Sequence, residues 1–219
     1  MIFDFHNHTF LSDGESIPIE HIRNASKNGY SIIGLTDHVS YSNIDYIIDA
    51  LKKDCRLAEE YWDIKAIPGV ELTNVPVKSI DEMAKYAKEK GAGLVTVHGE
   101  SIVEQVEPGT DYYAVNSDYV DILAHPGLIT PEEADMAAAK GVFLEITGKA
   151  GHSLTNGHVV KTGREQGAKF LINSDSHSYE GLYFGDGQIK VARGAGLDEN
   201  EIKEIFDKNV KLLLERIGM

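Results

Sequence analysis

The first stretch of this sequence with the composition of a reactive site is Asp4-Phe5-His6-Asn7-His8, followed closely by Ser12-Asp13-Gly14. Side chains alternate along an extended strand, so His6 and His8 are expected to point to the same side. Two neutral imidazole nitrogens that face together are half of a metal site. An isolated His-x-His pair has a simpler explanation, with one ring in solvent and the other in a local hydrogen bond. The rest of the chain must decide between the two.

Six of the nine histidines lie at or just after the end of an apolar run that is typical of a strand. Parallel strands bring their carboxyl ends to one face, so these histidines are expected to meet there, together with three carboxylates. Histidines scattered over a surface or a core would show no preference for strand ends. The candidate metal ligands are His6, His8, Asp13, His38, Glu71, His98, His125, Asp175 and His177.

The elements that must position these ligands alternate along the chain. The apolar runs cover residues 2–5, 31–36, 64–70, 93–97, 120–124, 142–146 and 169–173. Helices are predicted between them, with Ser16 and Thr130 as caps, and a single final helix opened by Asp198 and Glu201. Strand and helix in alternation indicate parallel strands with crossover helices. Because reactive residues follow almost every strand, a closed or nearly closed α/β barrel is favoured, as one domain over residues 1–219.

Composition limits the classes of function. With 35 acidic and 21 basic residues, the formal charge of −14 argues against a sequence-independent grip on nucleic acid or an anionic membrane. No apolar run reaches the roughly 18 residues of a membrane span, and the N-terminus does not resemble a signal peptide, so a cytoplasmic protein is expected. Cys55 is the only cysteine; it falls in the apolar stripe of a helix and is expected to be buried.

The number and type of ligands indicate which metals would bind. Nine ligands exceed what one tetrahedral or octahedral ion uses, which predicts two or three divalent ions. Imidazole and carboxylate without thiolate suit Zn²⁺, Mn²⁺ or Fe²⁺ better than Mg²⁺ or Ca²⁺. The choice among the three transition metals stays open.

Seven short motifs between residues 4 and 177 contain all of these ligands. They are Asp4-Phe5-His6-Asn7-His8, Ser12-Asp13-Gly14, Thr36-Asp37-His38, Pro68-Gly69-Val70-Glu71, Val97-His98-Gly99, Ala124-His125-Pro126-Gly127 and Ser174-Asp175-Ser176-His177. In type and order they resemble the motifs of the PHP (polymerase and histidinol phosphatase) family. The resemblance implies a distorted (β/α)₇ TIM-like barrel, a trinuclear metal site and hydrolysis of phosphoesters. The chain departs from many family members in being short, with no polymerase or other appended domain.

The same resemblance implies how the ligands are shared and how the site would act. The first metal, in the catalytic centre, would have His6, His8, Glu71 and Asp175, the second Glu71, His98 and His125, and the third Asp13, His38 and His177. Metals lower the pKa of a bound water, so hydroxide would attack phosphorus in line without a side-chain nucleophile.

Four further residues are candidates for substrate binding. Lys149 and His152 lie in the glycine-rich loop after the sixth strand and would contact phosphate or protonate the leaving group, although a solvated turn is equally consistent. Arg164 and Arg193 are weaker candidates, because a surface ion pair explains either of them as well. Glu145, near the end of that strand, would orient a metal-bound histidine or be a buried carboxylate with another partner.

The leading hypothesis is a metal-dependent phosphoesterase that hydrolyses a small phosphomonoester. Histidinol phosphate or a nucleotide is the named substrate by resemblance only. The alternative is a phosphodiesterase or 3′-5′ exonuclease; Tyr112 and Tyr113 could stack a base, but the charge of −14 disfavours a bound strand. A non-catalytic subunit of a ribonucleoprotein should be basic, and an amidohydrolase has no place for Asp13. Substrate and oligomeric state are left open.

Overall fold

A sheet of parallel β-strands forms the centre of the computed structural model, which describes residues 2–219. The strands are β1 (Ile2–Asp4), β2 (Tyr30–Leu35), β3 (His38–Val39), β4 (Lys65–Leu72), β5 (Leu94–His98), β6 (Ile122–Ala124), β7 (Phe143–Thr147) and β8 (Phe170–Asn173). They pair in the order β1, β2, β4, β5, β6, β7, β8, and β3 pairs with β4 outside that order. All of these pairs are parallel, so the carboxyl ends of the strands share one face.

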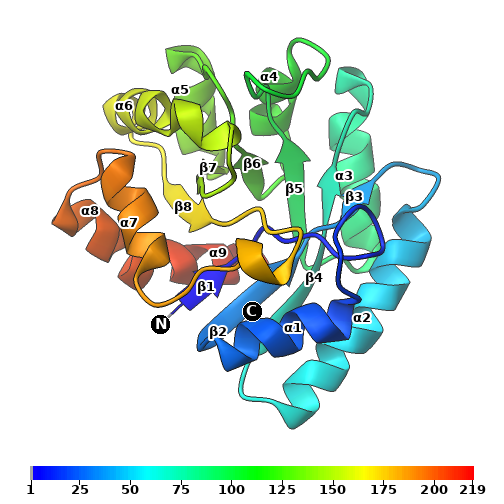
Figure 1. Cartoon of the computed structure of the whole chain (residues 1–219). Coiled ribbons are helices and arrows are strands. Elements are labelled where there is room, and N and C mark those ends of the chain that lie inside the picture. The colour runs from blue at the N-terminus through cyan, green and yellow to red at the C-terminus, as the bar shows by residue number, and fades with distance from the viewer. Residues whose placement is uncertain (1) are drawn as a thin grey trace.

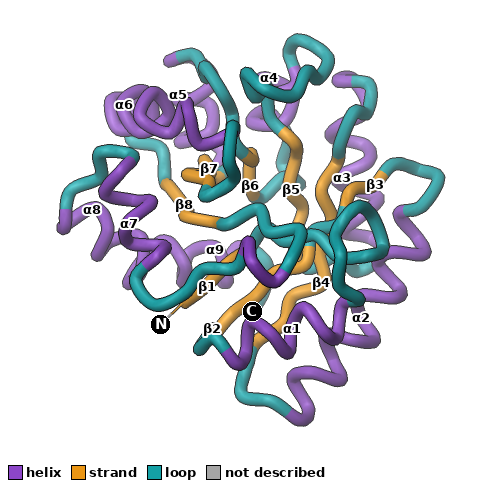
Figure 2. Tube along the Cα trace, viewed as in Figure 1, coloured by secondary structure: helices purple, strands orange, loops and turns teal. Residues whose placement is uncertain are grey.

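Helices surround the strands on the outside (Figures 1 and 2). They are α1 (Pro18–Lys27), α2 (Ile44–Tyr61), α3 (Ile80–Lys90), α4 (Thr110–Asn116), α5 (Pro131–Lys140), α6 (Asn156–Gln166), α7 (Gly187–Gly194), α8 (Glu199–Glu204) and α9 (Val210–Arg216). Each long helix buries one apolar face, and Cys55 lies within that of α2, as predicted. None of the helices formed by residues 2–219 has the length and apolar character that crossing a membrane requires.

Between β1 and β8 the barrel closes without a regular strand ladder, through side chains and an isolated parallel bridge between Asn7 and Ser176. The Phe5 amide donates to Oδ1 of Asn173 at 3.0 Å. Gln188 on α7 donates its amide to the carbonyl oxygens of Phe3, at 2.6 Å, and Ile172, at 2.7 Å. Buried backbone groups that lack a strand partner need such substitutes. The predicted nearly closed barrel of seven parallel strands is therefore confirmed, and its distortion is located at this seam.

Two of the three predicted helix caps are confirmed, but Ser16 is not a cap. The capping boxes of Thr130 with Glu133 and of Asp198 with Glu201 are both present. At the start of α1 the cap position belongs to Ile17, without a side-chain hydrogen bond. Ser16 instead accepts from the amide of Phe10 through its carbonyl oxygen at 2.8 Å, which fixes the loop after β1.

Three elements differ from the sequence prediction. The predicted final helix is helical throughout from Glu199 to Arg216, but residues 205–209 are π-helical and separate α8 from α9. In this stretch Asn209 is buried and donates to the carbonyl of Phe170 on β8 at 3.0 Å, a tertiary contact that no local pattern reveals. The short strand β3 and the helix α7 were also not predicted.

Helix α6 packs against the strands that carry part of the site, and two of its glycines offer a matched test of that packing. A Cβ added at Gly163 would lie 2.6 Å from Cε1 of Phe170 on β8, whereas at Gly157 the nearest atom would be 3.9 Å away. We expect Gly163→Ala to lower the free energy of unfolding by about 1–3 kcal/mol through overpacking. Gly157→Ala should raise it, by up to about 1 kcal/mol. Urea unfolding of both variants measures this, and equal stabilities would contradict the packing.

Candidate metal centre

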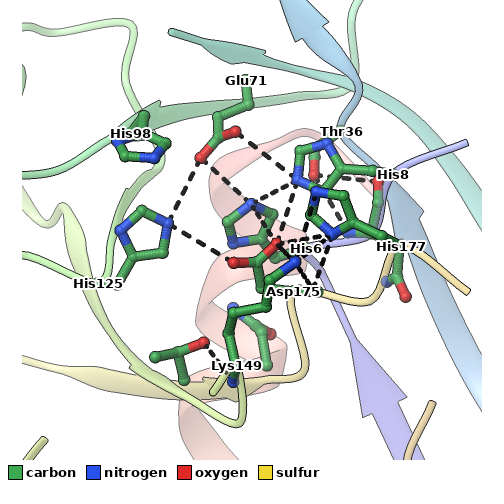
Figure 3. A network of polar contacts seen from close by, with 12 residues as sticks. His6, His8, Thr36, Glu71, His98, His125, Lys149, Asp175 and His177 are labelled. Carbon is green, nitrogen blue, oxygen red and sulfur yellow. Dashed lines mark hydrogen bonds and ion pairs between the residues drawn. The ribbon is translucent and has the colours of Figure 1, made fainter. Parts of the chain in front are cut away.

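All nine candidate ligands meet at the carboxyl ends of the strands. Figure 3 shows His6, His8, Glu71, His98, His125, Asp175 and His177 from close by. The nine ligands surround a narrow pocket of about 40 Å³. His6 and His8 lie beneath it and are fully buried, while the other ligands line it. The lining residues are Asp13, His38, Glu71, His98, Glu104, His125, Lys149, His152, Asp175 and His177.

The innermost ligands come from the two strands at the seam. His6 Nε2 lies 3.1 Å from His8 Nε2 and 3.2 Å from Glu71 Oε1. His8 Nε2 lies 3.3 Å from Oδ1 of Asp175. Asp4 connects the two chain segments, because its carboxylate accepts from the amides of His6 and Ser174, each at 3.2 Å. The seam thus places the first and the last of the sequence motifs side by side.

A second group gathers around Asp13 near the surface. Its Oδ2 lies 3.2 Å from His177 Nε2 and 3.5 Å from His38 Nε2, and its Oδ1 lies 3.8 Å from His8 Nδ1. The loop that carries Asp13 folds back so tightly that a Cβ at Gly14 would lie 2.5 Å from the carbonyl oxygen of His8. The Ser12-Asp13-Gly14 motif therefore needs its glycine for space.

A third group lies on the other side of Glu71. His125 Nε2 is 3.8 Å from Glu71 Oε1 and 3.8 Å from Asp175 Oδ2. The ring of His98 packs edge-on against that of His125, with centroids 4.5 Å apart. Its Nδ1 lies 3.1 Å from the carbonyl oxygen of Gly99, so the tautomer with the proton on Nδ1 would leave the lone pair of Nε2 for a metal.

The unpaired polar atoms and the charges of the nine candidate ligands are compatible with bound cations. Glu71 Oε1, His8 Nδ1 and His125 Nδ1 are buried without a hydrogen-bond partner among residues 2–219. Burial alone would raise the pKa of Glu71, but the charges of His6 and His38 hold it well below its ordinary value. Burial would likewise lower the pKa of His6, yet Glu145, Glu71 and Asp175 raise it well above the ordinary value. The pocket therefore favours positive charge at its centre.

Backbone strain is concentrated at the same place. Among residues 2–219, three non-glycine residues have positive φ, and two of them are His125, at 28°, and Asp175, at 53°. Such conformations are costly and persist where the surroundings impose them, typically at functional sites. After His125, a Cβ at Gly127 would lie 2.0 Å from the carbonyl of Glu100, so the turn cannot relax around a larger residue.

Glu145 forms hydrogen bonds to two of the candidate ligands from the side away from the pocket. It is fully buried on β7, and its Oε1 lies 2.8 Å from His6 Nδ1 and accepts from Nδ2 of Asn173 at 2.9 Å. Its Oε2 accepts from the backbone amide of His125 at 3.0 Å. Of the two alternatives left open by the sequence, the orienting role has the required geometry: a carboxylate on the far nitrogen of a candidate ligand fixes its tautomer.

The predicted substrate-binding residues divide into two pairs. Lys149 and His152 line the pocket, and Lys149 Nζ lies 2.6 Å from His177 Nδ1. Arg164 and Arg193 do not reach it. Arg164, in the last turn of α6, pairs with Glu201 at 2.6 Å, and Arg193, in the last turn of α7, pairs with Glu199 at 2.7 Å. Both arginines therefore have the surface ion pair that the sequence left as the alternative to substrate binding.

Sequence reasoning missed Glu104 and Ser101, which both contact histidines of the pocket. Glu104 Oε2 lies 3.0 Å from His98 Nε2, and Ser101 Oγ lies 2.7 Å from His152 Nδ1. Both lie in the aperiodic stretch after β5, where neither residue immediately follows a strand end. The only available signal was the length of that stretch, since long loops at strand ends often carry function.

We expect Glu145→Gln to weaken metal binding by about 10- to 100-fold, the usual effect of losing an outer partner. The amide would present its NH₂ group to a donor, either the His125 amide or His6 Nδ1–H. Metal titration of the chelator-treated protein measures this. Glu165→Gln, an exposed change on α6, is the matched control. Equal affinity in the two variants would contradict the orienting role of Glu145.

Comparison with known proteins agrees with this geometry. The family model described as PHP domain matches residues 4–218. An uncharacterized protein of Methanocaldococcus jannaschii is 47% identical over 99% of this chain and 100% of its own length. A protein of Thermoanaerobacter sp. named "probable phosphatase" is 27% identical over 91% of this chain and 89% of its own.

A solved structure adds a likeness in fold. The histidinol phosphate phosphatase of Lactococcus lactis subsp. lactis, in complex with zinc, L-histidinol and phosphate, has a TM-score of 0.55 and 16% identity. The match covers 99% of this chain and 94% of that one. With the family model spanning nearly the whole sequence and its motifs meeting in one pocket, this chain belongs to the PHP domain family.

Proposed function

We propose that this protein is a metal-dependent phosphatase that hydrolyses a small phosphomonoester. The observation that carries the proposal is the convergence of nine candidate imidazole and carboxylate ligands, with the buried Glu71 at their centre and Lys149 at the rim. The family membership and the relative named as a phosphatase support the same reaction class. Histidinol phosphate, bound as its hydrolysis products in the Lactococcus structure, is the first substrate to try.

The proposed ligand sets are those of the sequence motifs, two or three Zn²⁺, Mn²⁺ or Fe²⁺ ions in all. His6, His8, Glu71 and Asp175 would hold the first ion, Glu71, His98 and His125 the second, and Asp13, His38 and His177 the third. Bound ions of this kind supply an acidified water near neutral pH and neutralise charge on phosphoryl oxygens. Glu145 keeps His6 in the tautomer that offers Nε2 to the pocket.

Lys149 is the group that would recognise the phosphate. Among the residues that line the described pocket, it is the only lysine or arginine. Its ammonium lies 3.3 Å from the carbonyl oxygen of Asp175, with 29% of the side chain exposed, so it faces both the ligands and solvent. An ammonium in that position donates to a phosphoryl oxygen and orients the ester for attack.

The size and charge of the site favour a monoester over a nucleic acid strand. The pocket is narrow and most of its lining residues are acids or histidines, so the leaving group would remain outside, against the loops. A bound strand needs a basic groove with stacking platforms, and the chain carries a formal charge of −14. A nuclease remains the alternative that the substrate panel must exclude.

The experiment is a phosphate-release assay on protein stripped of metal and reloaded separately with Zn²⁺, Mn²⁺ or Fe²⁺. The panel contains histidinol phosphate, a nucleoside monophosphate and a single-stranded oligonucleotide. We expect hydrolysis of a monoester that chelator abolishes and metal restores, with the oligonucleotide left intact. Full metal occupancy without chelator-sensitive hydrolysis of any ester would refute the proposal. Shortening of the oligonucleotide would favour the nuclease.

Replacing Lys149 separates phosphate recognition from metal binding. Lys149→Met should lower kcat/KM for the best monoester by about 10- to 100-fold, the value of one charge-assisted hydrogen bond. Metal content should not change, because an ammonium is not a ligand. Lys161→Met, on the exposed face of α6, is the control. A kcat/KM equal to that of the control would rule out the phosphate contact.

A further inference from the structure

Three imidazoles, not two, gather on the far side of Glu71. His98, His125 and His152 each offer a ring nitrogen, and these nitrogens lie within 4.8 Å of one another. All three side chains are buried, with 3–4% of their surface exposed. The ring of His152 stacks on that of His125 with centroids 4.2 Å apart. The motifs that define the first three ligand sets do not include His152.

His152 is oriented as metal-binding histidines usually are. Its Nδ1 lies 2.7 Å from the hydroxyl oxygen of Ser101, itself buried in the loop after β5. When that oxygen accepts from Nδ1–H, the Nε2 lone pair faces the pocket. The position of the ring is thus held by a partner on a different loop, and that partner is compatible with the tautomer that a metal requires.

Glu104 covers the same group from the solvent side. Its Oε2 lies 3.0 Å from His98 Nε2, and its Oε1 lies 3.5 Å from His152 Nε2. With 60% of its side chain exposed, Glu104 is free to move away. The Gly99 carbonyl, 3.1 Å from His98 Nδ1, also accepts, so oxygen acceptors face both nitrogens of this ring. With its proton on Nδ1, His98 would offer Nε2 to a cation, which the carboxylate of Glu104 would also bind.

We propose that His152 is a third imidazole ligand of the second metal position, with His98 and His125, and that Glu104 closes this position from the loop after β5. Together with Glu71, this makes three imidazoles and two carboxylates, a five-ligand set that Zn²⁺ accepts and that returns to four when Glu104 leaves. Because Glu104 is exposed, it is the ligand that an incoming phosphate oxygen would displace. The proposal rests on the proposed function in one respect, because both require a metal ion at the second position.

The test is a Co²⁺ titration of metal-free protein, followed by visible absorption, with bound metal counted by elemental analysis. In His152→Ala we expect one class of sites to bind about 10- to 100-fold more weakly and its absorption to change. Ser101→Ala, which keeps the ring, should show a smaller loss of affinity. Glu104→Gln should alter the absorption of that site alone. His158→Ala is the control, because its ring bonds to the Ile129 carbonyl outside the pocket.

Two outcomes would overturn the proposal. One is a His152→Ala protein with unchanged Co²⁺ affinity and absorption while His98→Ala loses the site. The other is unchanged metal binding with a lower kcat, which would assign His152 to substrate. If His152→Ala does not fold by circular dichroism, Ser101→Ala and Glu104→Gln decide by the same readouts. Phosphate release measured on the same samples is a separate result: metal loading without hydrolysis would refute the phosphatase and leave this ligand set standing.

Discussion

The rest of the site depends on one buried carboxylate, that of Glu71. It is fully buried, yet His38 Nδ1 lies 2.7 Å away, His6 Nε2 3.2 Å, and His125 Nε2 3.8 Å. An ionised carboxylate in such a place is tolerated only when positive charge surrounds it. The three ligand groups therefore share a single centre of negative charge, and each is held in relation to it.

The barrel supplies this centre with ligands from opposite ends of the chain. Strand β4 places Glu71 in the middle of the sheet, whereas β1 and β8 bring their ligands to the seam. Outer groups then remove the remaining freedom: Glu145 orients His6, and Asp4 ties the His6 amide to Ser174. Preorganisation of this kind keeps ligands in productive geometry before anything binds.

The sequence was informative where chemistry coincided with strand ends. His98 ends β5 and His125 directly follows β6, so a period-two apolar run and the residue after it were enough to place them. Arg164 lies away from the pocket because a helix that follows a strand of a parallel barrel runs back towards the opposite face, where Arg164 pairs with Glu201. Glu104 was missed because its position depends on how an aperiodic loop folds over His98. The role of Gln188 on α7 could not be predicted either, because its partners are backbone carbonyls of β1 and β8 that only the folded barrel brings together.

The seam between β1 and β8 has a consequence for how the molecule assembles. Asp4 and Ser174, which meet there, are 170 positions apart in the chain. Closing so long a loop costs conformational entropy, and this cost is offset only when the last strand docks. An ion bound by His6, His8 and Asp175 together would connect the segments after β1 and β8. Its binding would therefore stabilise the N-terminal strand and the C-terminal third of the chain together. We therefore expect the candidate metal centre to form only when the first and the last strand of the barrel have met.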